Sequence, residues 1–456
     1  MKKVLLTGVA LIIFSATVFA QTNTAILNQN GNSQSASQQQ TGNYLQSVIE
    51  QDKQGGTNNG NYAGTVQNST GSAGNYAAIN QKNSAKSNKG LITQGGGTGN
   101  EATISQSNTS GQGTGVIMGT TSAASVRTAG GNWSSILQRG NNNVLTFTNQ
   151  DNTSYKNYSE IDQYGDDNRQ TSVNQSNTSY NNDAVIKQGA SGAGVSNDRA
   201  VVVQTNHSDH NKAYVTQLSS GNDAFITQQN YSSYNTGTIK QTGGSGSTAT
   251  IGQLNSDYGT ATITQTANDN EGTITQKQNS NHSKGTILQE GFDGEASITQ
   301  DRDEYGVATI KQYGITGKAS IEQVKTGSGP SSGNKATITQ NELTTAGYNN
   351  VARIVQGESA ASGRSDKNEA TITQEYSNNT AKLFQVGDRN KATASQWGDN
   401  NLIQGVGSSF ATQRGNDNTL TITQNSGSSA PYVPNVANVS QIGNSNTSVI
   451  TQVGVN

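Results

Sequence analysis

The chain has 456 residues, of which 30% are hydrophobic, 5% aromatic and 13% charged, and its formal net charge is −2. So little apolar material argues against the compact cores that an enzyme of this length would contain. The near-neutral charge provides no basic surface for nucleic acid, and three prolines with so low a net charge argue against a disordered chain.

Residues 1–20 are predicted to be a secretory signal sequence. Two lysines precede an apolar run at 4–14, and a small-residue cleavage site ends at Ala20. The alternative is an uncleaved membrane anchor, but the apolar run is short and is interrupted by polar residues. The chain has no cysteine, which rules out disulfides and a lipid-modified cysteine. We therefore expect a secreted chain that begins at Gln21 and does not insert into a membrane.

A seven-residue motif, Asn-x-Ala-x-Ile-x-Gln, recurs from Asn23–Gln29 to Asn446–Gln452. Clear internal copies lie at 75–81, 100–106, 182–188, 211–217, 222–228, 334–340, 368–374 and 418–424. Looser copies raise the number of units to roughly thirty to thirty-five. Strict alternation places Asn, Ala, Ile and Gln on one face, which is typical of a half-buried strand. The residues expected to form this core ladder include Ala184, Ile186, Gln188, Ala224, Ile226, Gln228, Ala336, Ile338, Gln340, Ala370, Ile372 and Gln374.

The spacing of the closing glutamines predicts how the strands are arranged. These glutamines lie at positions 217, 228, 241, 253, 265, 276, 289, 300, 312 and 323, so short and long intervals mostly alternate. Two strands joined by two unequal turns would form one rung of about 23 to 24 residues, giving roughly seventeen rungs. The predicted fold class is an all-β, two-sheet β-solenoid with cross-β stacking.

The shorter turn is predicted to carry the motif Gln-x-Gly-x-x-Asn, because glycine permits a sharp reversal. The motif lies at 138–143, 163–168, 385–390, 396–401, 413–418 and 441–446. Followed by x-Ala-x-x-x-Gln, it resembles the repeat of the curlins, the subunits of curli amyloid fibres. The segment QVGDRNKATASQ at Gln385–Gln396 matches the whole pattern, and the resemblance covers nearly all of the mature chain.

The solenoid domain is expected to span residues 21–456, with several departures from the regular pattern. The motif fades at 107–132, where Ile117 and Val126 mark candidate degenerate strands. Between Gln396 and Gln413 the phase of the repeat slips. Enlarged loops are expected near 324–334, 357–368 and 425–435, and two of these loops hold the three prolines, Pro330, Pro431 and Pro434. Proline confined to loops agrees with a solenoid.

The first and last units predict how the solenoid ends. Soluble solenoids normally carry polar capping repeats, whereas both terminal units here follow the internal motif. The expected self-assembly edges are Asn23, Ala25, Leu27, Gln29, Asn446, Ser448, Ile450 and Gln452. A head-to-tail contact between such edges does not close and propagates into a filament. We therefore expect a structural subunit of an extracellular cross-β fibre for biofilm matrix, adhesion and surface attachment.

The resemblance to the curlins implies further partners. They would be a curli-type outer-membrane secretion channel and a nucleator subunit, and the fibre would lie on the surface of a Gram-negative-type bacterium. The regular repeats favour the major subunit, and a minor nucleator or adhesin subunit is the alternative. We expect no enzymatic activity, no cofactor and no nucleic-acid partner.

Two other classes of protein compete with the fibre subunit. A soluble ice-binding or adhesive solenoid would use outward Thr-x-Thr pairs, which occur at Thr262/Thr264, Thr273/Thr275, Thr337/Thr339, Thr371/Thr373 and Thr421/Thr423. These pairs are interrupted by Lys311, Glu322 and Arg353 and are expected to be scattered over both faces, so strand propensity explains them better. A carbohydrate-active β-helix would need a recurring acidic pair, and none is visible.

A few loop residues remain outside the repeat. His207, Asp209 and His210 resemble a metal-binding set, but we expect them to be ordinary loop residues. Tyr164, Tyr313 and Trp397 each follow a repeat glutamine and precede a glycine, so they are predicted to pack on turns.

Overall fold

The computed structural model describes residues 23–30, 34–52, 61–69, 74–82, 88–95, 97–107, 131–151, 155–189, 198–325, 331–341, 348–357, 366–405, 409–426 and 434–454. The predicted signal sequence, the candidate strands at Ile117 and Val126, and the middle of each enlarged loop with Pro330 and Pro431 lie outside these residues. In the described part of the chain, no helix has the length and apolar character to cross a bilayer.

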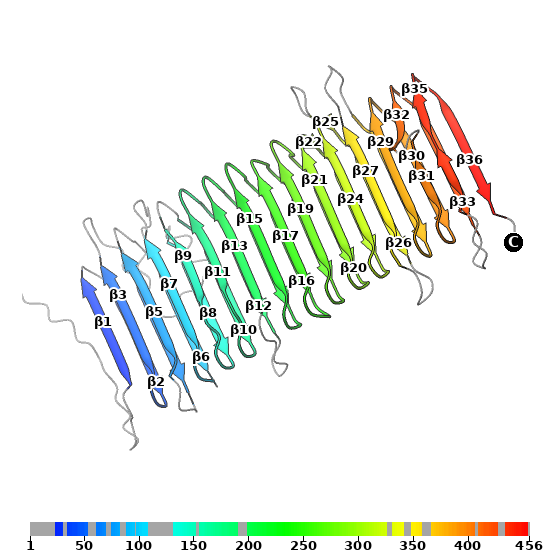
Figure 1. Cartoon of the computed structure of the whole chain (residues 1–456). Helices are drawn as coiled ribbons and strands as arrows, with labels where there is room; N and C mark the ends of the chain where they lie inside the picture. Colours follow the sequence, from blue (N-terminus) through cyan, green and yellow to red (C-terminus); the bar gives the residue numbers. More distant parts are fainter. Residues whose placement is uncertain are drawn as a thin grey trace, which may run out of the picture.

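The chain forms an elongated β-solenoid with β1 at one end and β36 at the other (Figure 1). The first sheet contains, in spatial order, β1 (Thr24–Asn30), β3 (Gln46–Asp52), β5 (Tyr76–Lys82), β7 (Glu101–Ser107), β9 (Thr146–Gln150), β11 (Thr171–Ser176), β13 (Arg199–Thr205), β15 (Asp223–Gln229), β17 (Thr248–Leu254), β19 (Glu271–Lys277), β21 (Glu295–Asp301), β24 (Lys318–Val324), β27 (Val351–Gly357), β29 (Thr380–Val386), the pair β31 (Leu402–Gln404) and β32 (Ala411–Arg414), and the pair β34 (Val436–Asn438) and β35 (Ser440–Ile442).

The second sheet runs alongside the first and is built from the strands between them in sequence. It contains β2 (Ser35–Thr41), β4 (Tyr62–Asn68), β6 (Lys89–Gly95), β8 (Trp133–Arg139), β10 (Tyr158–Tyr164), β12 (Asp183–Gln188), β14 (Lys212–Gln217), β16 (Thr236–Gln241), β18 (Thr260–Gln265), β20 (Lys284–Gln289), β23 (Val307–Gln312), β26 (Lys335–Asn341), β28 (Glu369–Glu375), β30 (Lys391–Trp397), β33 (Thr419–Asn425) and β36 (Thr447–Val453). The short strands β22 (Asp303–Glu304) and β25 (Ser331–Ser332) pair separately.

One strand from each sheet makes one rung, which confirms the predicted fold class. All pairing is parallel and holds the repeat in register, so that Gln204 pairs with Gln228 and Gln228 with Gln253. The second sheet has 16 strands, so the described chain makes 16 rungs, close to the predicted seventeen. The difference arises at 107–132, because β6 pairs directly with β8 and β7 with β9, and no rung lies between them.

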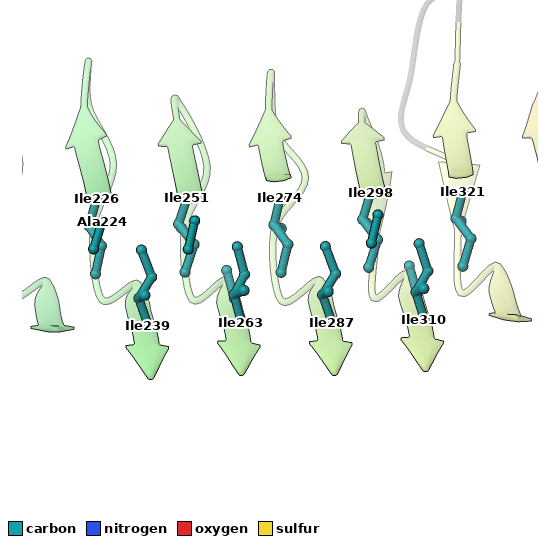
Figure 2. Close-up of a cluster of buried hydrophobic side chains, with 14 of the residues drawn as sticks. Ala224, Ile226, Ile239, Ile251, Ile263, Ile274, Ile287, Ile298, Ile310 and Ile321 are labelled. Carbon is teal, nitrogen blue, oxygen red and sulfur yellow. The ribbon is translucent and has the colours of Figure 1, made fainter. Parts of the chain in front are cut away.

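The core is a double row of aliphatic side chains between the sheets. Figure 2 shows Ile226, Ile251, Ile274, Ile298 and Ile321 of the first sheet facing Ile239, Ile263, Ile287 and Ile310 of the second. All nine of these side chains are fully buried. Burying one such side chain stabilises the fold by roughly 1.5–3 kcal/mol, so the energy of the solenoid grows with the number of rungs.

The phase slip between Gln396 and Gln413 has a structural cause. Both β31 and β32 pair with β29, so together they occupy the place of one strand in the first sheet. The chain is interrupted between them. The interruption is closed by a hydrogen bond from the backbone N–H of Gly405 to the carbonyl of Ser409, at 2.7 Å. The next rung repeats the interruption, since β34 pairs with β31 and β35 with β32.

The Gln-x-Gly-x-x-Asn turns occur at both edges of the solenoid. Three of them follow strands of the second sheet (β8, β10, β30) and three follow strands of the first (β29, β32, β35). The shorter turn therefore changes edge along the chain. In each turn the glycine and the residue before the asparagine have positive φ, as in Gly415 (+118°) and Asp417 (+58°), which explains why glycine stands at the first of these positions.

Candidate functional site: amide ladders and end rungs

The closing glutamines form two hydrogen-bonded ladders, one along each sheet. In the first sheet, the side-chain Nε2 of each glutamine donates to Oε1 of the glutamine one rung further toward β35, from Gln29 to Gln441, at 2.7–3.0 Å. The second sheet carries the same ladder from Gln40 to Gln452, with the same direction and the same range of distances. Both ladders are therefore polar and point the same way.

Most ladder amides also donate to backbone carbonyls beside the strands that precede and follow them in sequence. Gln241 Nε2 donates to the carbonyls of Asp223 at 3.1 Å and Ser247 at 3.0 Å, while Gln228 Nε2 donates to the carbonyl of Lys212 at 3.0 Å. These glutamines are fully buried, and a buried amide without partners would be costly. The bonds thus tie adjacent rungs together and close the turns of a single rung at the same time.

Asparagines form a third set of ladders that explains the spacing of the turn motif. The backbone N–H of Asn418 donates to Asn390 Oδ1 at 3.1 Å, and Asn390 Nδ2 donates to the carbonyl of Gly415 at 2.7 Å. The next rung repeats this pattern from Asn418 Nδ2 to the carbonyl of Gly443. The asparagine therefore binds the glycine carbonyl of the following rung, a link that the sequence analysis missed because it considered turns one at a time.

The structure places the twelve predicted core-ladder residues inside the solenoid. Ala184, Ile186, Gln188, Ala224, Ile226, Gln228, Ala336, Ile338, Gln340, Ala370, Ile372 and Gln374 are each at most 2% exposed. Equivalent residues stack directly on one another, for example Ile338 on Ile372 and Gln340 on Gln374.

The predicted edge residues lie on the end rungs. Leu27 of β1 is 42% exposed and Ile450 of β36 is only partly buried, whereas their partners on the next rung, Ile49 and Ile422, are fully buried. Asn23, Ala25 and Gln29 belong to or adjoin β1, and Asn446, Ser448, Ile450 and Gln452 belong to or adjoin β36. Within the described residues, β1 pairs only with β3 and β36 only with β33, so one edge of each strand is open.

The two ends carry opposite hydrogen-bonding groups. At the β1 end, Gln29 and Gln40 are the first members of their ladders. Among the described residues, no glutamine donates to their Oε1 atoms, whereas every inner ladder glutamine accepts such a bond. At the β36 end, Gln452 Nε2 donates within the described chain to the carbonyl of Val436, whereas Gln441 Nε2 donates both to the carbonyl of Thr419 and to Ser448 Oγ. One end thus presents acceptors, and the other presents a donor on Gln452 and a Gln441 amide whose bond to Ser448 Oγ a new acceptor would replace.

The loop residues outside the repeat pack against aromatic rings. His207 stacks on Tyr231 with ring centroids 4.7 Å apart, and His210 stacks on Tyr234 at 4.6 Å. Across the described ranges, no group of three or more His, Cys, Asp or Glu side chains could hold a metal ion. Among the predicted turn-packing aromatics, Tyr164 lies under the Arg139 guanidinium, Trp397 lies beside Tyr376, and Tyr313 remains 37% exposed.

The expectation about the threonines is only partly correct. Of the five Thr-x-Thr pairs, four lie on the second sheet (β18, β26, β28, β33), and only Thr273/Thr275 lies on the first. Glu322 and Arg353 are on the first sheet and do not interrupt the others, whereas Lys311 of β23 does lie on the second sheet between β18 and β26. The glutamine spacing already predicts that successive strands belong to alternate sheets. Assigning the strands to sheets by this rule would have placed four of the five pairs on the same sheet.

The fold and the ladders define the class of protein: a parallel two-sheet β-solenoid that stacks identical amides from rung to rung as cross-β fibres do. The family model for the curlin associated repeat matches residues 377–404, which include β29, β30 and β31. The predicted resemblance to the curlin repeats is confirmed, and the chain carries a curlin associated repeat. No curated protein matched the chain.

Proposed function

We propose that this protein is a secreted structural subunit that assembles head to tail into extracellular curli-like amyloid fibres, which contribute to biofilm matrix, adhesion and surface attachment. The observation that carries the proposal is the complementarity of the two ends. Acceptors of Gln29 and Gln40 at one end match the amide of Gln452 at the other, and also the amide of Gln441 once it exchanges Ser448 Oγ for an acceptor of the next copy.

Docking one copy on the next would continue every ladder across the junction. The edges of β1 and β2 would pair with β34, β35 and β36 of the neighbour in the same parallel register as inside the chain. Such a contact joins unlike surfaces by translation, so it does not close and yields a filament. Open strand edges of this kind pair readily with other chains.

Two pairs of substitutions test this junction while leaving the internal ladder bonds in place. In Q441E/Q452E, the new carboxylates still accept from Gln413 and Gln424 but cannot donate to the next copy. In Q29K/Q40K, the ammonium groups still donate to Gln51 and Gln67 but cannot accept. Each variant alone should remain unpolymerised, whereas an equimolar mixture should form fibres because Lys ends meet Glu ends.

Assembly is followed by light scattering, and the fibres by diffraction, which should show a meridional reflection near about 4.7 Å. The outward substitution T264E, on β18 in the middle of the solenoid, adds charge far from the junction and should assemble like the unaltered chain. If unaltered chain stays monomeric for days at micromolar concentration, or if the end variants polymerise alone at the unaltered rate, the proposal fails.

The secretion partners form a second part of the proposal, supported by the curlin repeat match. The signal sequence at 1–20 would be removed, and the chain would leave a Gram-negative-type cell through a curli-type outer-membrane channel and meet a nucleator subunit there. Deleting the gene should remove surface fibres if the chain is the major subunit. Fibres that persist in altered number or attachment would instead favour the minor nucleator or adhesin role.

The second sheet supports one other candidate, a soluble ice-binding solenoid. Threonines stack in register on eight consecutive rungs of this sheet, at Thr238, Thr262, Thr286, Thr309, Thr337, Thr371, Thr393 and Thr421. From β26 to β33 a second row of hydroxyls accompanies them, giving a lattice of about 4.8 by 6.7 Å that can order water. Thermal hysteresis in the monomer, abolished in T371K, would support this function, and its absence would exclude it.

A further inference from the structure

Seven aromatic side chains line up in a single file along one edge of the solenoid. They are Tyr155, Tyr180, His210, Tyr234, Tyr258, His282 and Tyr305, each from a turn that leads from the first sheet to the second. The rings from His210 to Tyr305 are stacked, whereas Tyr155 is tilted against Tyr180 and Tyr180 meets His210 edge to face. Ring centroids of neighbours lie 4.5–5.1 Å apart, close to the strand spacing. We call this row the aromatic file.

The backbone fixes the spacing of the file. Backbone hydrogen bonds of 2.9 Å join each turn to the one before it. The donors are the N–H groups of Tyr234, Tyr258, His282 and Tyr305, and each acceptor is the carbonyl of the residue that immediately precedes the aromatic residue of the previous rung. The five residues from His210 to Tyr305 also share a left-handed backbone conformation, with φ between +55° and +59°. The rings therefore stand at regular intervals because the turns are locked from rung to rung.

The two histidines divide the file into short runs of tyrosine. Tyr155 lies 4.5 Å from Tyr180 with the two rings tilted by 39°, and Tyr234 stacks on Tyr258 at 4.9 Å, whereas Tyr305 has only His282 as its partner in the file. His210 separates the first pair from the second. Tyr234 and Tyr258 are 47% and 51% exposed, so a small oxidant in solution can reach them.

We propose that these two tyrosine pairs are sites of oxidative cross-linking that join adjacent rungs covalently. The co-reactants are hydrogen peroxide and a haem peroxidase. Each phenol loses one electron and one proton, the two radicals form one carbon–carbon bond between ring positions next to the hydroxyls, and both rings regain aromaticity. Two hydrogens leave in total, and one peroxide is reduced to two waters.

The geometry favours this chemistry over recognition of a planar ligand. The faces of the inner rings are covered by their neighbours in the file, so a sugar or a flat molecule cannot stack on them. The ring edges, which carry the reactive positions, remain available where the side chains are exposed. A cross-link between neighbouring rungs would hold the solenoid together under conditions that break hydrogen bonds.

The test treats the full chain with hydrogen peroxide and a haem peroxidase, then identifies cross-linked peptides by mass spectrometry after proteolysis. Peptides joining Tyr155 to Tyr180 and Tyr234 to Tyr258 should appear within one molecule, each two hydrogens lighter than the sum of its parts. A mixture of isotopically light and heavy chains separates bonds within a molecule from bonds between molecules. Tyr305 should not be joined to Tyr258.

Substitutions within the file distinguish loss of a cross-link from loss of the fold, because a second cross-link in the same molecule serves as the control. Y258F keeps the stacked ring and should lose the bond to Tyr234, while the bond between Tyr155 and Tyr180 persists as an internal control. H282Y should create new cross-links from position 282 to Tyr258 and Tyr305. Cross-links spread over tyrosines outside the file, or unaltered products in H282Y, would overturn the proposal.

Discussion

Asp198 is a carboxyl in a position where other rungs hold an amide. It directly precedes β13 as Asn222 precedes β15, and its Oδ1 accepts the backbone N–H of Asn222 at 2.9 Å. Its Oδ2 is buried without a hydrogen-bond partner. Burial raises the pKa of this carboxyl to about 7, because removal from water penalises the charged form more than the bonds from Asn222 and Gly221 favour it.

This carboxyl should make the stability of the solenoid depend on pH. In the unfolded chain Asp198 would titrate near 3.8, so between about pH 4 and 7 the folded state holds the proton more tightly and stability falls as pH rises. The slope is at most about 1.4 kcal/mol per pH unit. Urea unfolding of D198N should show a smaller loss of stability over this range than the unaltered chain. Parallel curves for the two proteins would contradict the prediction.

Gly415 should not tolerate a side chain. Its φ is +118°, and a Cβ at this position would lie 2.0 Å from the carbonyl oxygen of Gly443 on the next rung. G415A should therefore lower the free energy of unfolding by at least about 1–2 kcal/mol. The control is G252A, where a Cβ would have no atom within 4 Å. Equal unfolding midpoints for the two variants would show that the turn can relax.

At the scale of single strands and turns, the sequence predicts most of what the structure contains. Alternation alone identifies the buried face, and Ala224, Ile226 and Gln228 of β15 lie inside as expected. Relations between rungs are harder to predict, because they join residues about two dozen positions apart. The aromatic file could not be predicted for this reason: its rings fall at the fifth or sixth position after a glutamine, and two of the seven are His rather than Tyr.

The strand core should respond to truncation much more strongly than the outer face. Ile263 of β18 is fully buried between Ile239 and Ile287, so I263A should cost about 2–5 kcal/mol of stability. Thr262 in the same strand points outward, and T262A should cost much less. Guanidinium unfolding followed by circular dichroism measures both variants. Similar losses would mean that the column of isoleucines repacks around the gap.

At the scale of the whole molecule, stability is a sum over neighbouring rungs rather than the property of one compact core. The interval between ladder glutamines predicts this architecture, and it also predicts the number of rungs wherever the interval is regular. The count fails at 107–132, because a sequence interval does not show whether a faded repeat adds a rung, and here β6 pairs directly with β8 and β7 with β9.

Removing a complete rung should therefore be tolerated better than removing a single strand. Deletion of 229–253 removes β16 and nearly all of β17 and joins Gln228 directly to Leu254. Because Gln228 pairs with Gln253 in the register, Leu254 then takes the place of Gln229 at the end of β15. The remaining strands can then pair as before, with β14 on β18 and β15 on β19. Deletion of β16 alone, Thr236–Gln241, removes far fewer residues but leaves β14 and β18 without the strand that joins them.

The expected result is a thermal unfolding midpoint within a few degrees of the unaltered chain for the larger deletion and a clearly lower midpoint for the smaller one. Nearest-neighbour stacking requires this order, because the larger deletion replaces two rung contacts by one of the same kind. The opposite order would mean that the rungs are not interchangeable. The stability of the solenoid would then depend on individual contacts near β16 rather than on the repeat.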